Sequence, residues 1–257
     1  MDHPITITLI ANAGVLLEYR GERLLVDGLH SDPDIPQFSS VPEPLLGQML
    51  QGSGSLADIE FLLFTHCHGD HYSARLAEQY LRANRVRRLV MPARQIGRDE
   101  AVLEAARQRG TQITLLDMPL YELRSYPLDS HSSVSAFRAV HAGKEYEQVE
   151  HFCLLLEFEG RSVLVVADAD YDAAYFRRVL GSREVEAALV NPLFLNKSTG
   201  RAVIEAIAPK RLLVYHIPFA QQDSYGLRRL VPRDSEKYRD TLPPVTALTE
   251  ELQSVSI

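Results

Sequence analysis

Cysteine is scarce in this 257-residue sequence, which contains only Cys67 and Cys153. Two cysteines are too few for a secreted protein stabilised by several disulfides, so a reducing compartment is expected. We expect both to be small, buried, hydrophobic residues. The start of the sequence has no basic segment and its apolar stretch is interrupted at Asn12, so no signal peptide is predicted. These absences together predict a cytoplasmic protein.

Long apolar runs and an excess of positive charge are also missing. No apolar run approaches the length that crosses a membrane. The 27 Lys and Arg against 34 Asp and Glu give a net charge of −7, so nothing indicates a nucleic-acid or anionic-membrane surface. Hydrophobic residues make up 46% of the chain, enough to bury the core of one domain, or of two fused halves that share a core.

The most informative stretch is residues 64–71, which holds three of the nine histidines. Residues 59–64 before it read as a buried strand, and residues 71–81 after it have the apolar spacing of a helix, whose dipole favours an aspartate at its start. A strand places residues two apart on the same side. We therefore expect a strand-turn-helix corner at which imidazole and carboxylate groups converge to bind a metal, zinc rather than iron or manganese. The candidate ligands are His66, His68, Asp70 and His71.

The rest of the first half predicts an α/β architecture, because strands alternate with helices. The proline-rich segment 30–58 is expected to be a flap with a short helix near 45–50, and His30 at its root to be a surface histidine. The predicted strands are 5–10, 15–19, 24–27, 88–92, 113–116 and 121–126, and the predicted helix after the 88–92 strand is 98–108.

Polar residues follow several predicted strands of the second half. The strands are 134–140, 152–158, 162–166, 187–190 and, as the last, 211–215, and the helices are 171–179 and 198–207. His141, Asp168 and His216 each come at or just after a strand's carboxyl end, the edge at which α/β sites are assembled.

The His-x-His-x-Asp-His pattern of residues 66–71 resembles the signature of the metallo-β-lactamase-fold metallohydrolases, a superfamily that includes glyoxalase II, lactonases and RNase Z. The resemblance extends over nearly the whole chain. It implies a four-layer αββα sandwich of two mixed sheets flanked by helices. It also implies a single domain over 1–257, made of two pseudo-symmetric halves that meet near 126–133.

The resemblance further implies a dinuclear site with two Zn²⁺ per chain, with iron or manganese as other occupants. His141 resembles the third histidine of the first metal site, Asp168 the carboxylate that bridges both ions, and His216 the last histidine of the second site. The implied ligands are His66, His68, Asp70, His71, His141, Asp168 and His216. Ala167 departs from the family, which usually has glycine at that position.

Other polar residues have less certain parts in the expected site. His151 competes with His141 as a ligand, and we expect it instead to contact substrate or a ligand, with a structural role equally open. For Asp170 too, a contact with substrate or a ligand and a structural role are equally open. Asp27 and Asp58 are candidates to orient the imidazoles from outside.

The implied function is that of a zinc-dependent hydrolase, in which a metal-bridging hydroxide, oriented by the catalytic Asp70, attacks a small ester, lactone, thioester or phosphoester. The substrate is expected to be anionic or to contain a carbonyl. Two alternatives stay open, an RNase Z-like nucleic-acid phosphodiesterase and a non-catalytic metal-binding or sensing protein; a mononuclear iron dioxygenase acting on persulfides is a weaker variant. His68 stands where flavodiiron proteins carry Glu, and the basic cluster 82–88 lies at the far end of the motif helix. The histidine at position 68 argues against di-iron oxygen reduction, and the position of the basic cluster argues against a nuclease. The oligomeric state stays open.

Overall fold

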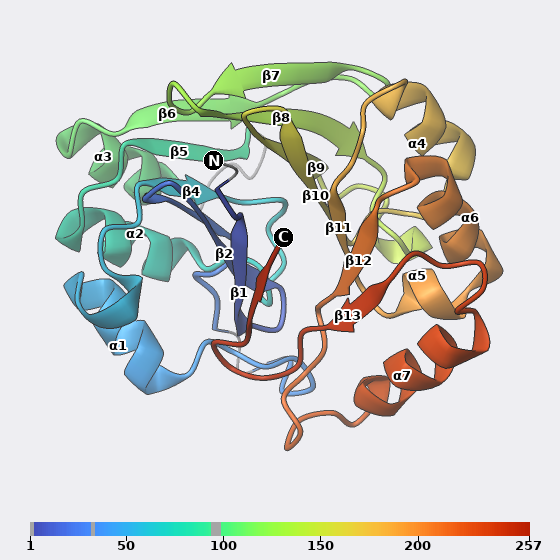
Figure 1. Ribbon diagram of the computed structural model, residues 1–257. Coiled ribbons are helices and arrows are strands. Elements are labelled where there is room, and N and C mark those ends of the chain that lie inside the picture. Colours follow the sequence, from blue (N-terminus) through green and yellow to red (C-terminus); the bar gives the residue numbers. More distant parts are fainter. Residues whose placement is uncertain (1–2, 32–33, 94–98) are drawn as a thin grey trace. The chain divides into compact units, whose positions relative to one another are not determined.

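The computed structural model describes residues 3–31, 34–93 and 99–257 (Figure 1). The chain forms two compact units, unit 1 from Met1–Asp117 with Glu250–Ile257, and unit 2 from Met118–Thr249. The expectation of one domain whose two halves meet near 126–133 stays a prediction. Each unit contains one mixed seven-stranded sheet and its own helices, which confirms the α/β class with two mixed sheets.

Unit 1 is built on a sheet whose strands are ordered β14-β1-β2-β3-β4-β5-β6. The first three strands in sequence form an antiparallel meander, and β3, β4, β5 and β6 are parallel neighbours. The strands are β1 Thr6–Ala11, β2 Gly14–Tyr19, β3 Glu22–Val26, β4 Phe61–Leu63, β5 Arg88–Pro92, β6 Gln112–Leu116 and β14 Ser254–Ser256; the helices are α1 Glu43–Gln51, the 3₁₀ turn Gly54–Leu56, α2 Ala74–Ala83 and α3 Glu100–Gln108.

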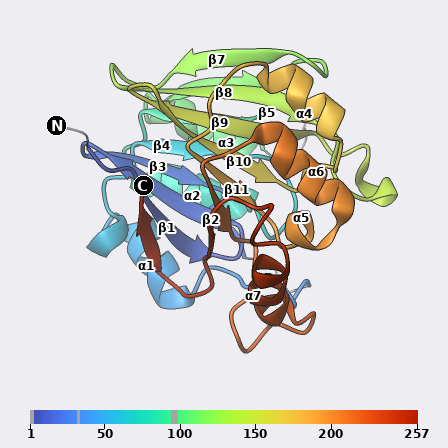
Figure 2. The ribbon, with the colours of Figure 1, turned by 45° about the vertical axis from the view of Figure 1, so that its right-hand side comes forward.

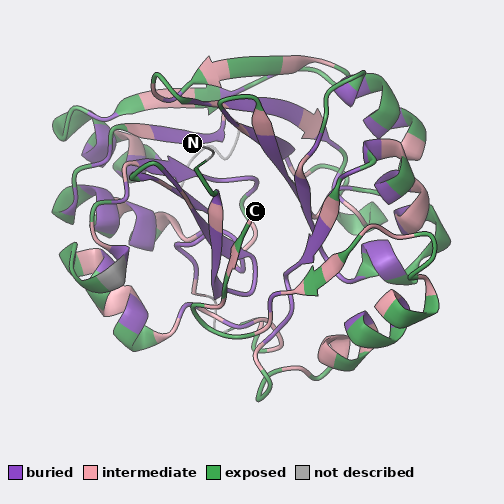
Figure 3. Ribbon diagram, viewed as in Figure 1, coloured by how far each residue is buried: buried purple, intermediate pink, exposed green. Residues whose placement is uncertain are grey.

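Helix α2 shows why the segment after residue 71 is helical. Its apolar residues recur at helical spacing, and Leu76, Ala77, Tyr80 and Leu81 are buried. Burial of a leucine side chain contributes about 1.5–3 kcal/mol. The central strands β4 and β5 are buried except for half-buried Arg88 at the start of β5, so they read as continuous apolar runs rather than as alternating ones. Figure 3 shows these strands buried and the helices buried mainly along one side.

Unit 2 is built on a sheet ordered β13-β12-β11-β10-β9-β8-β7, in which β7 to β10 are antiparallel neighbours and β10 to β13 are parallel ones. Helices α4 and α6 lie side by side over this sheet (Figure 2). The strands are β7 Leu123–Pro127, β8 Ser132–Ala139, β9 His151–Phe158, β10 Arg161–Ala167, β11 Ala187–Val190, β12 Arg211–Val214 and β13 Val245–Ala247; the helices are the 3₁₀ turn Lys144–Tyr146, α4 Ala173–Leu180, α5 Leu193–Asn196, α6 Ser198–Ile207 and α7 Leu227–Lys237.

Two expectations about the elements are wrong. The strand ending at Val214 is not the last one, because β13 and β14 follow, and β14 pairs with β1 at the other end of the sequence. Three-residue strands carry too little periodicity to be found locally. The helix after the histidine motif begins at Ala74 rather than at residue 71, because the Ser73 hydroxyl caps it by accepting from the Leu76 N–H.

The helix expected over 98–108 is α3, and its expected first residue, Arg98, lies outside the described residues. The short helix expected near 45–50 is α1.

Among the residues that the structure describes, no helix combines the length and apolar character needed to cross a membrane.

Candidate metal centre

The histidine motif lies in the ligand loop, residues 65–73, which connects β4 to α2 in unit 1. The backbone N–H groups of His71 and Tyr72 both donate to the carbonyl of His68 at 2.9 Å, which closes a tight turn. Asp70 and His71 therefore lie in this turn, before the helix rather than inside it. Buried Tyr72 fixes the end of the loop by donating to Asp99 at 2.5 Å, and burial, followed by this hydrogen bond, raises the pKa of Tyr72 well above its usual range.

Asp27, which follows β3, is fully buried and accepts three hydrogen bonds from the ligand loop. The Thr65 N–H donates at 2.8 Å, the Thr65 hydroxyl at 2.6 Å and the Nδ1 of His71 at 2.9 Å. Because the hydroxyl hydrogen of Thr65 goes to Asp27, the same hydroxyl accepts from Nδ1 of His66 at 3.0 Å. Both histidines are thus held with Nδ1 protonated, which leaves each Nε2 lone pair available to a metal.

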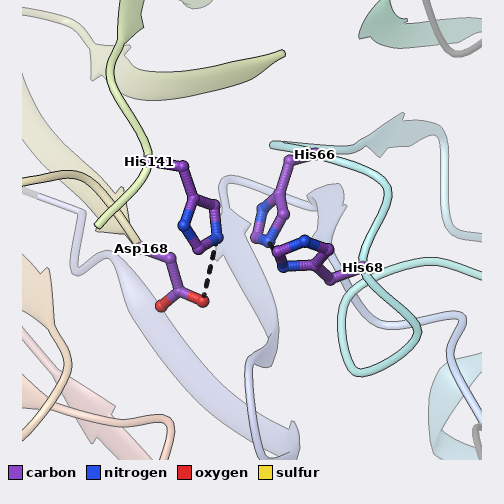
Figure 4. Close-up of side chains that lie close together, drawn as sticks. All are labelled: His66, His68, His141 and Asp168. Carbon is purple, nitrogen blue, oxygen red and sulfur yellow. Dashed lines mark hydrogen bonds and ion pairs between the residues drawn. The ribbon is translucent and has the colours of Figure 1, made fainter. Parts of the chain in front are cut away.

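The remaining contacts of the ligand loop fit a metal site. Nε2 of His66 lies 3.2 Å from Nδ1 of His68 (Figure 4), and Nε2 of His71 lies 3.9 Å from Oδ2 of Asp70. Donor atoms about 2.0–2.2 Å from a tetrahedral zinc ion lie roughly 3.4 Å from one another. His66, Asp70 and His71 are buried, and His68 is half-buried. The described loop therefore offers nitrogen and oxygen donors at distances of 3.2 and 3.9 Å, close to the spacing of donors around a tetrahedral metal ion.

Unit 2 carries a second set of ligands around Asp168, at the carboxyl ends of its parallel strands. One carboxylate oxygen lies 3.6 Å from Nε2 of His141 (Figure 4), and the other lies 3.6 Å from Nε2 of His216. Nδ1 of His141 donates to the carbonyl of Ala142 at 2.8 Å, so its Nε2 also carries the lone pair. These N···O distances fit two donors on a shared ion.

The backbone adopts left-handed φ angles at several residues in or next to the candidate ligands. Asn12, Asp27, Ala167 and His216 all have positive φ, with angles of 39°, 50°, 51° and 57°. At Ala167 the pairing of β10 with β11 shifts register, so the strand ends on a bulge that delivers Asp168. Glycine adopts such angles at no steric cost, which explains why the resembled family prefers it before the bridging aspartate. Strained backbone of this kind gathers at functional sites.

His151 is fully buried beside these ligands. Its Nε2 accepts from the backbone N–H of Asp168 at 3.1 Å, and its ring centroid lies 5.5 Å from that of His141. This contact fits a residue that holds Asp168 in place, and its expected catalytic role stays a prediction. Asp170 is exposed, and its backbone N–H donates to the carbonyl of Val140.

Three expectations about individual residues are wrong. His30 is not a surface histidine but is 1% exposed, with Nε2 lying 3.3 Å from the carbonyl of Ala11. Cys67 is exposed rather than buried, while Cys153 is buried as expected. Asp58 is exposed before the amino end of β4, at the edge of the sheet away from the ligand loop, so it cannot orient the imidazoles.

Three polar residues that contact the ligands were missed in the sequence. Thr65 links His66 to Asp27, Asn12 donates to Asp70, and Asn191 donates to Asp168 at 3.3 Å. Asn191 follows β11, so the rule that selected His141, Asp168 and His216 should have selected it too. Asn12 lies in a hairpin turn, where asparagine is common for reasons of backbone conformation alone.

No model of a known protein family matches this sequence, and no curated protein matches it significantly. Solved structures do share its fold. A metallo hydrolase from the archaeon Ignicoccus hospitalis is 11% identical with a TM-score of 0.62, covering 99% of this chain and 98% of its own. An isothiocyanate hydrolase from Delia radicum gut bacteria is 13% identical with a TM-score of 0.62, covering 98% and 99%.

A diiron β-hydroxylase, CmlA from Streptomyces venezuelae, is 16% identical with a TM-score of 0.61. The match covers all of this chain but only 54% of the hydroxylase, so this chain spans about half of that protein's length. Two further structural neighbours, from Parabacteroides distasonis and Veillonella parvula, are named a "putative" and a "possible" metal-dependent hydrolase. Two mixed seven-stranded sheets with flanking helices thus give this chain a fold that it shares with solved metallohydrolases.

Proposed function

We propose that this protein is a hydrolase that uses two zinc ions. The observation that carries the proposal is the ligand loop with Asp27, where buried hydrogen bonds hold imidazoles with Nε2 free of protons. Seven ligands exceed what one tetrahedral ion can use, which favours two ions. The proposed ligands are His66, His68, Asp70, His71, His141, Asp168 and His216.

The charge of this ligand set suits an anionic or carbonyl-containing substrate. Five neutral imidazoles and two carboxylates carry −2 against the +4 of two divalent ions, so the loaded site keeps a positive charge. Such ions lower the pKa of water and polarise the bond to be broken. Asp70 would orient the attacking water and pass a proton to the leaving group, while Asp168 would offset charge near both histidines that face it.

Small esters, lactones, thioesters and phosphoesters are the proposed substrates, rather than nucleic acid. Two of the four arginines of the basic cluster 82–88 are paired with carboxylates within unit 1, Arg82 with Glu78 at 2.9 Å and Arg87 with Glu60 at 3.1 Å. A polynucleotide site needs several arginines and lysines available to phosphates. The cluster also follows the carboxyl end of α2, while the ligand loop precedes its amino end.

The test is hydrolysis of lactone, thioester, phosphomonoester and phosphodiester substrates by metal-free protein and by protein reloaded with zinc. We expect turnover of at least one class only after loading, and its loss in Asp70→Asn. His131→Ala is the matched control, because His131 is an exposed histidine paired with Glu159 at 2.8 Å. Zinc-loaded protein that hydrolyses none of the classes would contradict the proposal.

Two further arms of the same experiment separate other functions. Zinc-dependent cutting of tRNA would favour the nuclease. Oxygen consumption by iron-loaded protein, without hydrolysis, would favour an oxygenase; one neighbour of the same fold is a diiron β-hydroxylase.

A further inference from the structure

Asn12 lies in the turn between β1 and β2 and reaches the ligand loop. It is fully buried, and its side-chain N–H donates to Oδ2 of Asp70 at 3.3 Å. The backbone has φ of 39°, a left-handed angle that asparagine tolerates better than most residues. The conformation of the turn alone would therefore accept asparagine or glycine, and only the contact with Asp70 requires the amide.

The turn is fixed in place by contacts that do not involve the Asn12 side chain. A Cβ added to Gly14 would lie 2.8 Å from the Cα of Gly28, so the two backbones touch at a distance that only glycine allows. On the other side of the turn, Nε2 of buried His30 lies 3.3 Å from the carbonyl of Ala11. The hairpin is thus clamped against the segment that follows Asp27, and Asn12 is presented to the ligand loop.

Within the part of the chain that the structure describes, only one end of the Asn12 side-chain amide makes a hydrogen bond, and its partner is Asp70. Its amide nitrogen donates to the carboxylate, while its Oδ1 is buried and makes no hydrogen bond among the described residues. Rotating the amide by half a turn would place Oδ1 against the carboxylate and repel it. A residue kept only for packing would satisfy both ends of a buried amide, so this arrangement serves the carboxylate.

We propose that Asn12 is a positioning residue for Asp70, whose N–H fixes the carboxylate in the orientation that binds metal and handles the proton. The inference rests on the ligand role of Asp70 in the proposed function. Nε2 of His71, 3.9 Å from the same oxygen, is too distant to fix it by a hydrogen bond. Asn12 thus donates directly to the carboxylate oxygen of Asp70 that also faces His71.

The test compares Asn12→Gly, which keeps the left-handed turn and removes the amide, with Asn12→Asp, which keeps the shape and replaces a donor by an acceptor. Metal-free protein is titrated with Co²⁺, and the visible absorption spectrum reports both affinity and ligand geometry. We expect both variants to bind Co²⁺ about 10- to 100-fold more weakly, with an altered spectrum. For the substrate that the wild type hydrolyses, kcat should fall about 10- to 100-fold, more than KM changes.

Asn84→Ala is the matched control, since Asn84 is a buried asparagine of the same unit that donates to the carbonyls of Met49 and Tyr80. It should unfold more easily yet keep wild-type Co²⁺ affinity and spectrum. If Asn12→Gly does not fold, Asn12→Asp, which is close to isosteric, carries the test. Wild-type affinity and spectrum in the Asn12 variants would overturn this role alone, whereas a wild-type protein that binds no Co²⁺ would overturn the proposed function as well.

Discussion

At the scale of single residues, Asp27 connects the fold of unit 1 to the chemistry of the ligand loop. It accepts from the backbone and hydroxyl of Thr65 and from His71, all in a fully buried position. Hydrogen bonds to a buried charge contribute about 1.5–3 kcal/mol each, so this carboxylate stabilises the loop as well as orienting imidazoles.

Replacing Asp27 by Asn should therefore affect both stability and metal binding, because an amide carries no charge and turns an N–H toward one of the donors. We expect the free energy of unfolding to fall by about 1–3 kcal/mol and metal affinity to fall about 10- to 100-fold. Urea unfolding and Co²⁺ titration measure the two effects. Asp58→Asn is the matched control and should change neither, because Asp58 is exposed at the other edge of the sheet.

His141 and His151 should separate in their effect on metal content. His141→Ala removes an Nε2 that faces Asp168 at 3.6 Å, so it should lose bound metal. His151→Ala removes an acceptor of the Asp168 backbone N–H, so it should retain metal and at most lower turnover. Elemental analysis of the two purified variants decides the matter, and metal loss in the His151 variant alone would reverse the assignment.

The two cysteines should differ sharply in reactivity toward a thiol reagent. Cys67 is exposed, whereas Cys153 is fully buried, and burial raises the pKa of its thiol well above the usual range. Native protein should take up one equivalent of iodoacetamide, at Cys67, and unfolded protein two. Peptide mass spectrometry locates the label, and modification of Cys153 in the folded protein would contradict this burial.

At the scale of elements, local sequence patterns predicted the long strands and helices but not contacts between distant segments. The buried runs of β5 and β10 and the apolar stripe of α2 carry their own periodicity. The pairing of β14 with β1 depends on residues almost a chain length apart, and no local pattern encodes it. The sequence also predicts α2 to begin at residue 71, whereas the helix begins at Ala74, because the ligand loop continues as far as the capping residue Ser73.

Two helical glycines should respond oppositely to alanine. In α6, a Cβ on Gly200 would lie 2.6 Å from the Cα of Phe194, so Gly200→Ala should destabilise by about 1–3 kcal/mol. In α1, a Cβ on Gly47 would meet nothing within 4 Å, so Gly47→Ala should stabilise by about 0.5–1 kcal/mol. Chemical unfolding measures both, and equal effects of the same sign would contradict the close packing of α5 on α6.

At the scale of the whole molecule, the candidate ligands could be selected because their spacing and their positions at strand ends can be read from the sequence. Parallel strands bring their carboxyl ends to one edge of a sheet, and Asp168 and His216 follow such strands in unit 2. Asn12 and Thr65 could not be selected in the same way, since their roles depend on side-chain directions in a turn. The substrate is not encoded at this level either, because one fold supports many chemistries.

The most direct test of the central claim is the metal content of the purified wild-type protein after reloading with zinc and dialysis, measured by elemental mass spectrometry. Seven ligands of imidazole and carboxylate type predict close to two zinc ions per chain. Protein that retains no zinc, or that holds a single iron ion and no zinc, would contradict the dinuclear zinc centre.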